Sequence, residues 1–177
     1  MTASPRIRAL CLLGAWGLFG CLSAFAQKPA QDQALSQRIQ RLEDKDEIRT
    51  LLIDYGRHLD ARDFAAYSRL FAKNGQWVGG FGTVEGPAAI QAFMEKNIPG
   101  ANKGHTYHIL SNFEIDVHGD TATAWSRWAY VVPGADGKPV IAQGGHYDDA
   151  LVRENGHWRF QRRSAPSDIP ALEPKSK

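Results

Sequence analysis

Apolar residues recur at helical spacing in the first half of the chain and at alternate positions in the second half. The strongest helical stripe consists of Ile48, Leu52, Tyr55 and Leu59. A weaker stripe over 35–42 precedes it, and the charged stretch 44–47 is either a joint between two helices or the solvated part of one. Residues 27–34 are polar and predict a flexible lead-in.

Two shorter helices follow. Asp63 is a good N-cap for a helix over 64–71, and Gly86-Pro87 opens another over 87–97. Between them, residues 73–86 predict a short strand among glycines. The loop 98–104 ends the helical half of the chain.

Four long strands are expected after this loop, over 108–117, 121–132, 140–153 and 158–163. The strongest turn signal is Asn155-Gly156, which predicts a tight hairpin between the last two strands. Its register is expected to pair Arg153 with Trp158, Leu151 with Phe160, and Asp149 with Arg162.

The order of helices first and strands second predicts an α+β domain, with helices on one face of a strongly curved antiparallel sheet. We expect a lead-in over 27–43 that is polar at first and then helical, the domain over 44–165 and a flexible tail over 166–177. No internal repeat or low-complexity tract interrupts this plan.

The first 26 residues predict a signal peptide. Arg6 and Arg8 precede a run that is almost wholly apolar, and an Ala-x-Ala site places cleavage after Ala26. Export to the periplasm or medium is therefore expected. An uncleaved anchor and lipidation at Cys21 are less favoured alternatives.

Cleavage would change the charge and the cysteine content. The formal net charge falls from +2 to 0, because the leader holds two arginines and no acidic residue. Without a basic excess, nucleic acid and stable membrane association are not expected. Both cysteines, Cys11 and Cys21, lie in the leader, so the mature chain has no thiolate nucleophile or metal ligand.

Several motifs resemble the SnoaL-like branch of the nuclear transport factor 2 superfamily. They are "YGRHLDARDFAAYSRLFA", "VEGPAAIQAFM", "HILSNFEIDVHGDTATAWS" and "GGHYDDALVRENGHWRFQRR", and the resemblance runs from about 44 to 163. It implies a cone-shaped barrel, in which three helices cover the concave face of the sheet around a mostly apolar pocket. Related folds include scytalone dehydratase, dehydrochlorinase and ketosteroid isomerase, and others without catalytic roles, so the fold leaves the chemistry open.

The same resemblance implies a catalytic pair. In the dehydratase and dehydrochlorinase relatives, a carboxylate ending the first long helix bonds a histidine on the first long strand, and the matching positions are Asp60 and His108. An ionised carboxylate fixes the imidazole tautomer and leaves the other ring nitrogen free to take a proton. Tyr55 matches a tyrosine that assists the leaving group. Helix capping by Asp60 and core packing by Tyr55 are the structural alternatives.

Strand alternation puts this pair in question. His108, Leu110 and Asn112 share one face of the strand, and Phe113, Ile115 and Val117 share the other. If the second set packs under the helices, His108 points outwards. The catalytic hypothesis therefore predicts a bulge between Ile109 and Phe113.

Other candidates are weaker. His105 and His108 fall on opposite faces of a strand, so no metal site is expected, and His105 is a rim residue. Further candidates for contact with substrate, any of which could serve packing instead, are Trp77, Trp125, Arg127 and His146. The basic residues Arg159, Arg162 and Arg163 are expected to pair with Asp148 and Asp149 on a solvated face.

Three functions remain open at this point. The first is a cofactor-free lyase acting on a small hydrophobic molecule, or an isomerase using the same base. The second is a non-catalytic module that binds such a molecule, and the third is an interaction domain. In each case the exposed face of the sheet predicts a homodimer or homotrimer.

Overall fold

The computed structural model describes residues 22–98, 100 and 103–169. The chain divides into two compact units, 1–39 and 40–177. In the first unit, the described residues belong to helix α1 (Leu22–Ala61), and all of 30–39 is exposed. Most of the predicted signal peptide, residues 1–21, lies outside the described residues.

Helix α1 is continuous through 44–47, so of the two alternatives the single helix holds, although Asp44 in this stretch is buried. The lead-in 27–34, expected to be flexible, is helical. Within the second unit, its predicted stripe is buried: Ile48 and Leu52 are fully inaccessible, and Tyr55 and Leu59 are nearly so. The helix ends where Arg62 adopts a positive φ of 57°. Asp63 then caps α2 (Phe64–Ser68) by accepting a hydrogen bond from the backbone N–H of Ala66.

Helix α3 (Pro87–Asn97) begins at the predicted proline. Between α2 and α3 lie two strands rather than one, β1 (Phe71–Gly79) and β2 (Gly82–Glu85). Phe71, expected at the end of a helix, instead begins β1. It joins the core against Phe160, with the two ring centroids 5.3 Å apart, because burial overrides local helical spacing here.

The remaining strands follow the predicted order. They are β3 (Tyr107–His118), β4 (Thr121–Pro133), β5 (Pro139–Glu154), β6 (His157–Ala165) and β7 (Ser167–Ile169). The expected flexible tail over 166–177 therefore begins with a strand, which pairs with β5. Residues 170–177 lie outside the described part of the chain.

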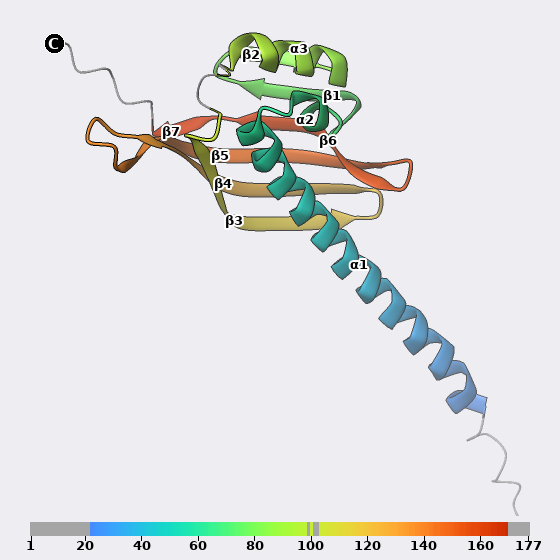
Figure 1. Ribbon diagram of the computed structural model, residues 1–177. Helices are drawn as coiled ribbons and strands as arrows, with labels where there is room; N and C mark the ends of the chain where they lie inside the picture. Colours follow the sequence, from blue (N-terminus) through green and yellow to red (C-terminus); the bar gives the residue numbers. More distant parts are fainter. Residues whose placement is uncertain (1–21, 99, 101–102, 170–177) are drawn as a thin grey trace, which may run out of the picture. The chain divides into compact units, whose positions relative to one another are not determined.

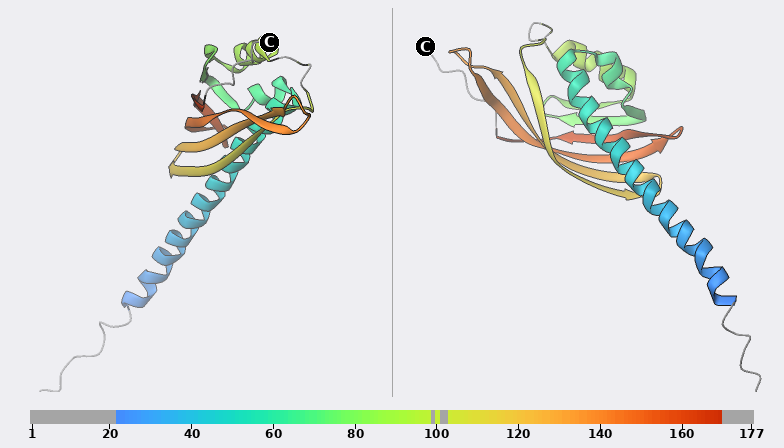
Figure 2. Two further views of the ribbon diagram at one scale, coloured as in Figure 1. Left: turned by 90° about the vertical axis from the view of Figure 1, so that its left-hand side faces the viewer. Right: turned by 60° about the horizontal axis from the view of Figure 1, so that its bottom comes forward.

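The seven strands form one curved, open sheet in the order β2-β1-β6-β5-β4-β3, with β7 beside β5 (Figure 1). Figure 2 shows that β3, β4 and β5 are strongly curved. The expectation of a purely antiparallel sheet is wrong in one place, because β1 runs parallel to β6. The connection between these two strands is long, because β2, α3, β3, β4 and β5 all lie between them in the sequence.

The Asn155-Gly156 hairpin is confirmed, with φ of 52° and 81° at the two turn residues. Arg153 pairs with Trp158 and Leu151 with Phe160, as predicted. A register shift between Ala150 and Leu151 then pairs Asp149 with Arg163 rather than with Arg162. A one-residue shift exchanges the two faces of a strand, so Arg163 is buried and Arg162 is exposed.

The part of α1 from residue 40 onwards covers one face of the sheet, called the inner face here. Arg153 of β5 donates to Asp44 at 2.6 Å, and the backbone N–H of Trp158 donates to Glu47 at 3.1 Å. Burial tends to raise the pKa of Asp44, but hydrogen bonds from Arg153, Gln40 and Trp158 leave it lowered. These contacts fix α1 across the β5–β6 hairpin.

Candidate active site

Asp60 and His108 meet at the end of α1. The Nδ1 of His108 lies 2.7 Å from Oδ1 of Asp60, and the backbone N–H of His108 donates to Oδ2 of the same carboxylate at 2.9 Å. The two side chains are 15% and 21% exposed, so the pair is largely shielded from water. Both carboxylate oxygens are engaged by one residue, which fixes the imidazole relative to the helix.

A bulge turns His108 to the inner face. The register of β3 against β4 shifts between Ser111 and Glu114, and Asn112 takes a φ of 55°. Asparagine tolerates this left-handed conformation better than most residues. His108 therefore lies on the same face as Ile115 although strict alternation would separate them. The predicted bulge is confirmed, and its register shift, between Ser111 and Glu114, overlaps the expected interval from Ile109 to Phe113.

The rings of Tyr130 and Trp128 flank His108, with centroids 4.8 and 6.4 Å from that of the imidazole. Among the described residues no hydrogen bond reaches the Nε2 of His108. A carboxylate on Nδ1 favours the tautomer that carries its proton there, which leaves a lone pair on Nε2. The arrangement can therefore accept a proton from a molecule lying against these aromatic rings.

Tyr55 and Trp77 lie on the inner face but deeper than the pair. Tyr55 is five residues before Asp60 on α1, which corresponds to about 7.5 Å along a helix axis. Its hydroxyl accepts a hydrogen bond from Nε1 of Trp77 at 3.1 Å. Tyr55 also packs against Tyr67 and Tyr147, with ring centroids 4.7 and 5.4 Å away. The structure gives it a buried packing position and brings it into no contact with His108.

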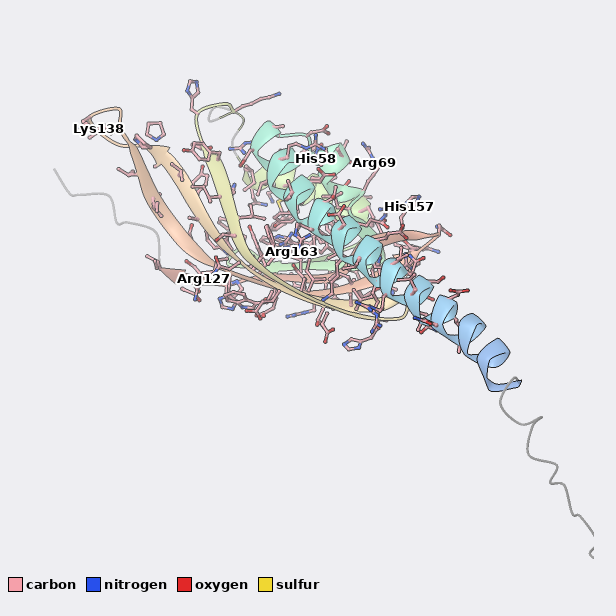
Figure 3. All side chains as sticks on the ribbon, turned by 90° about the horizontal axis from the view of Figure 1, so that it is seen from below. His58, Arg69, Arg127, Lys138, His157 and Arg163 are labelled. Carbon is pink, nitrogen blue, oxygen red and sulfur yellow. The ribbon has the colours of Figure 1, made fainter. Side chains whose placement is uncertain are left out.

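Three other expected pocket residues face the opposite, outer side of the sheet. Trp125 and Arg127 alternate with the buried positions of β4, and His146 is the β5 partner of Arg127. Figure 3 labels Arg127 on this side. A small molecule that touches His108 does not reach them, so the expectation that they share its pocket is wrong. The sequence pattern of β4 and β5 does not indicate which face of the sheet these side chains occupy.

These outer residues form a cluster of their own around Asp168 of β7. The Nδ1 of His146 lies 2.9 Å from the Asp168 carboxylate, and Arg127 donates to it at 3.1 Å. The Nε2 of His146 lies 3.2 Å from Asp148. Hydrogen bonding from His146 lowers the pKa of Asp168.

The outer face also carries an open groove of about 520 Å³ over β3 to β6, and Trp125, Asp148 and Arg162 are among its lining residues. His105, expected at the rim of the site, lies exposed in the turn before β3. Within the described residues, no group of three or more potential ligands is arranged to hold a metal ion.

One charged residue of the inner face was missed. Arg163 was expected on a solvated surface, but it is fully buried beside Asp149. Burial raises the pKa of Asp149 to about 7, although the nearby Arg163 lowers it. Only the register shift at Ala150 reveals this position, and no pattern in the sequence marks that shift.

The family model of the SnoaL-like domain matches residues 40–164. This chain belongs to the SnoaL-like family. An uncharacterised protein of Mycobacterium tuberculosis is 31% identical to it over 130 residues, covering 71% of this chain and 86% of the relative.

Solved structures agree on the fold of this SnoaL-like chain. A protein from Novosphingobium aromaticivorans, named NTF2-like with a cystatin-like fold, is 30% identical with a TM-score of 0.70, covering 76% of this chain and 88% of that one. A second protein from the same organism, whose assignment as a scytalone dehydratase is itself a prediction, is 23% identical with a TM-score of 0.59, covering 77% and 96%. Among the described helices of the SnoaL-like chain, none has the length and apolar character needed to cross a membrane.

Proposed function

We propose that this protein is a cofactor-free lyase of the dehydratase or dehydrohalogenase type, acting on a small hydrophobic molecule. His108 is the general base and Asp60 orients it. The observation that carries the proposal is the 2.7 Å contact between Nδ1 of His108 and Asp60, which leaves Nε2 without a partner among the described residues.

In the reaction, Nε2 of His108 takes a proton from the carbon next to the one that bears the leaving group. The C–H electron pair becomes the second bond of the new alkene, and the C–O or C–halogen bond breaks with its electrons going to the leaving group. A departing hydroxide recovers the proton as water, whereas a halide leaves as an ion and the proton passes to solvent. The ionised Asp60 stabilises the imidazolium formed in between.

The likeness to the predicted scytalone dehydratase supports this class at the level of the fold. An isomerase would use the same base and return the proton to a different carbon. A non-catalytic binding module would retain the aromatic surroundings of His108, Tyr130 and Trp128, but its ligand would leave unchanged.

Product analysis separates these functions. Purified protein is incubated with secondary alcohols and chlorinated cyclohexanes, and alkene, chloride and positional isomers are measured. His108→Ala should lose turnover by about 10²–10⁴-fold, the range typical of a general base. The matched control is His118→Ala, because His118 pairs with Asp116 at 3.1 Å on the same strand but is 65% exposed. Equal turnover in the two variants would refute the proposal.

Export is part of the proposal. Its support is the basic start, apolar run and Ala-x-Ala site of residues 1–26. N-terminal sequencing of protein recovered from the periplasm or medium should begin at Gln27. Recovery of the uncut chain from the cytoplasm would contradict export.

We also propose a homodimer or homotrimer. Large apolar side chains gather at one end of the outer face, where the register brings β3, β4, β5 and β7 together. They are Tyr107, Ile109, Ile141 and Ile169, each between 48% and 61% exposed. Sedimentation should give twice or three times the monomer mass at micromolar concentration, and Ile109→Lys should release monomers. A wild-type monomer under these conditions would count against the proposal.

A further inference from the structure

Arg163 occupies an unusual position under α1 (Figure 3). Its side chain is 0% exposed, and the centre of its guanidinium lies 3.9 Å from the ring centroid of Tyr55 and 3.8 Å from that of Tyr147. Phe160 contributes a third ring at 4.5 Å. Aromatic rings therefore enclose the charge and separate it from water.

Its hydrogen-bonding capacity is not met. The Nε of Arg163 lies 3.2 Å from Oδ1 of Asp149, but within the described part of the chain none of its three nitrogens makes a hydrogen bond. Oγ of Ser126 and Oδ2 of Asp149 are also buried without a hydrogen bond, and Oδ1 of Asp149 has only the ion-pair contact with Nε of Arg163. Native interiors leave very few such atoms, because each costs about 1–3 kcal/mol and charged groups cost more.

The geometry of the Arg163 guanidinium indicates which chemical group could bind it. A guanidinium offers a planar fork of N–H donors and no acceptor, and a carboxylate matches the fork with two parallel hydrogen bonds. Asp149 does not fill this role, since it approaches Nε and leaves both Nη atoms without a partner. The aromatic rings of Tyr55 and Tyr147 suit the apolar skeleton of a ligand rather than a second polar group.

Arg163 and the His108–Asp60 pair lie on one face of one sheet under one helix. Tyr55, which covers Arg163, and Asp60 are five residues apart, which is about 7.5 Å along α1. A chain of rings connects the two places: Trp128 lies 6.4 Å from His108 and 6.0 Å from Tyr147, which covers Arg163.

We propose that Arg163 binds the carboxylate of the substrate, which is a small cyclic carboxylic acid whose ring extends towards His108. The inference rests on the proposed function for the direction in which the ring extends. The carboxylate is a remote anchor rather than the group that reacts. Arg163 is accordingly a substrate-binding residue and takes no part in proton transfer.

Binding of matched probes tests the assignment. 2-Naphthoate and 2-naphthamide share a skeleton and differ in charge, and their affinities for the full protein are measured by calorimetry at pH 8. The wild type should bind the acid at least about tenfold more tightly than the amide, since one charge-assisted pair is worth about 1.5–3 kcal/mol. Arg163→Met should remove this preference.

A second variant keeps the test decisive if Arg163→Met fails to fold. Asp149→Asn retains the guanidinium and removes the competing carboxylate, so it should bind naphthoate more tightly than the wild type and bind naphthamide unchanged. Circular dichroism and thermal unfolding confirm that each variant is folded. Equal affinity for the two probes in the wild type, or binding of neither, means that water satisfies Arg163, and overturns the inference.

The outcome is separable from that of the proposed function. His108→Ala should retain the preference for the acid while it loses turnover. A preference for the acid without any effect of His108→Ala on turnover would refute the lyase and keep the anion site. Loss of turnover in His108→Ala, without a preference for the acid in the wild type, would support the lyase and refute the anion site.

Discussion

The two faces of the sheet each carry a histidine whose Nδ1 meets an aspartate, at 2.7 Å for His108 and Asp60 and at 2.9 Å for His146 and Asp168. The pairs differ at the second nitrogen. Asp148 lies 3.2 Å from Nε2 of His146, whereas no side chain among the described residues bonds Nε2 of His108. Under the proposed function, His108 can act as a base because its second nitrogen has no such partner and lies against the rings of Tyr130 and Trp128.

Their surroundings differ as well. The carboxylate of the inner pair is 21% exposed and that of the outer pair 38%. Arg127 shares Asp168 with His146, so the outer pair belongs to a charged surface network that solvent screens. The inner pair lies against Tyr130 and Trp128 and has no third charged partner among the described residues.

The largest difference between the two faces is expected in turnover, when the aspartate of each pair loses its charge. Asp60→Asn should reduce turnover by between about tenfold and the ~10²–10⁴-fold that a general base contributes, because the imidazole loses its orientation and the stabilisation of its charged form. Asp168→Asn should leave turnover unchanged. Steady-state rates of the two variants on the same substrate provide the measurement, and equal losses would end the distinction.

The bulge that turns His108 inwards offers the next test. Asn112→Val places a β-branched residue at a φ of 55° and should lower the free energy of unfolding by about 1–2 kcal/mol or more. It should also reduce turnover, because valine avoids the strained φ if the bulge is lost, and a strand without the bulge turns His108 to the outer face. Asn112→Gly, the control, accepts the same φ and should retain both properties. Chemical unfolding and rates on the two variants decide the matter, and a valine variant as active as the glycine variant would contradict the role of the bulge.

The buried Asp149 should make stability depend on pH. Its folded pKa is about 7 against an ordinary value of 3.8, so the native state holds a proton that the unfolded state has released between these values. The stabilisation is fully present below about pH 4 and is lost as pH rises through 7, by at most a few kcal/mol. Urea unfolding at several pH values should show a smaller decline over this window in Asp149→Asn. Parallel curves for wild type and variant would show that Asp149 is ionised in the fold.

The smallest effect is expected at the outer pair. Hydrogen bonding from His146 lowers the pKa of Asp168, so His146→Gln should move that pKa upwards towards its ordinary value. Carboxylate carbon shifts followed by NMR would report the change. The stability gained from this pair is present at neutral pH and lost as pH falls through the lowered pKa, and it should be small because the groups are exposed. An unchanged Asp168 titration in the variant would remove His146 as the cause.

Much of the fold could be predicted because local patterns agree with tertiary burial. The stripe from Ile48 to Leu59 and the turn at Asn155-Gly156 are local signals, and both were confirmed. The parallel pairing of β1 with β6 could not be predicted, since it joins segments distant in sequence. Successive side chains of a strand point to opposite faces, so each bulge changes which residues are buried. The register shift at Ala150 in this way buried Arg163, which was expected to be exposed.

The candidate pair was located through the family resemblance, and its orientation followed from a bulge that the hypothesis required. Trp125, Arg127 and His146 were misplaced for the opposite reason. Polar residues on an alternating strand are compatible with a buried site and with a solvated face, and only neighbouring strands decide between them. Asp168 of β7 contacts both Arg127 and His146, and no sequence pattern indicated this role.

The tautomer of His108 is the sharpest test of whether Asp60 prepares this histidine to act as a base. Nitrogen chemical shifts of the neutral imidazole, read from long-range ¹H–¹⁵N correlation spectra, distinguish a proton on Nδ1 from one on Nε2. In the wild type His108 should carry its proton on Nδ1, facing Asp60, and in Asp60→Asn the proton should move to Nε2. A proton on Nε2 in the wild type would leave the nitrogen assigned to catalysis without a lone pair, and His108 could not be the general base.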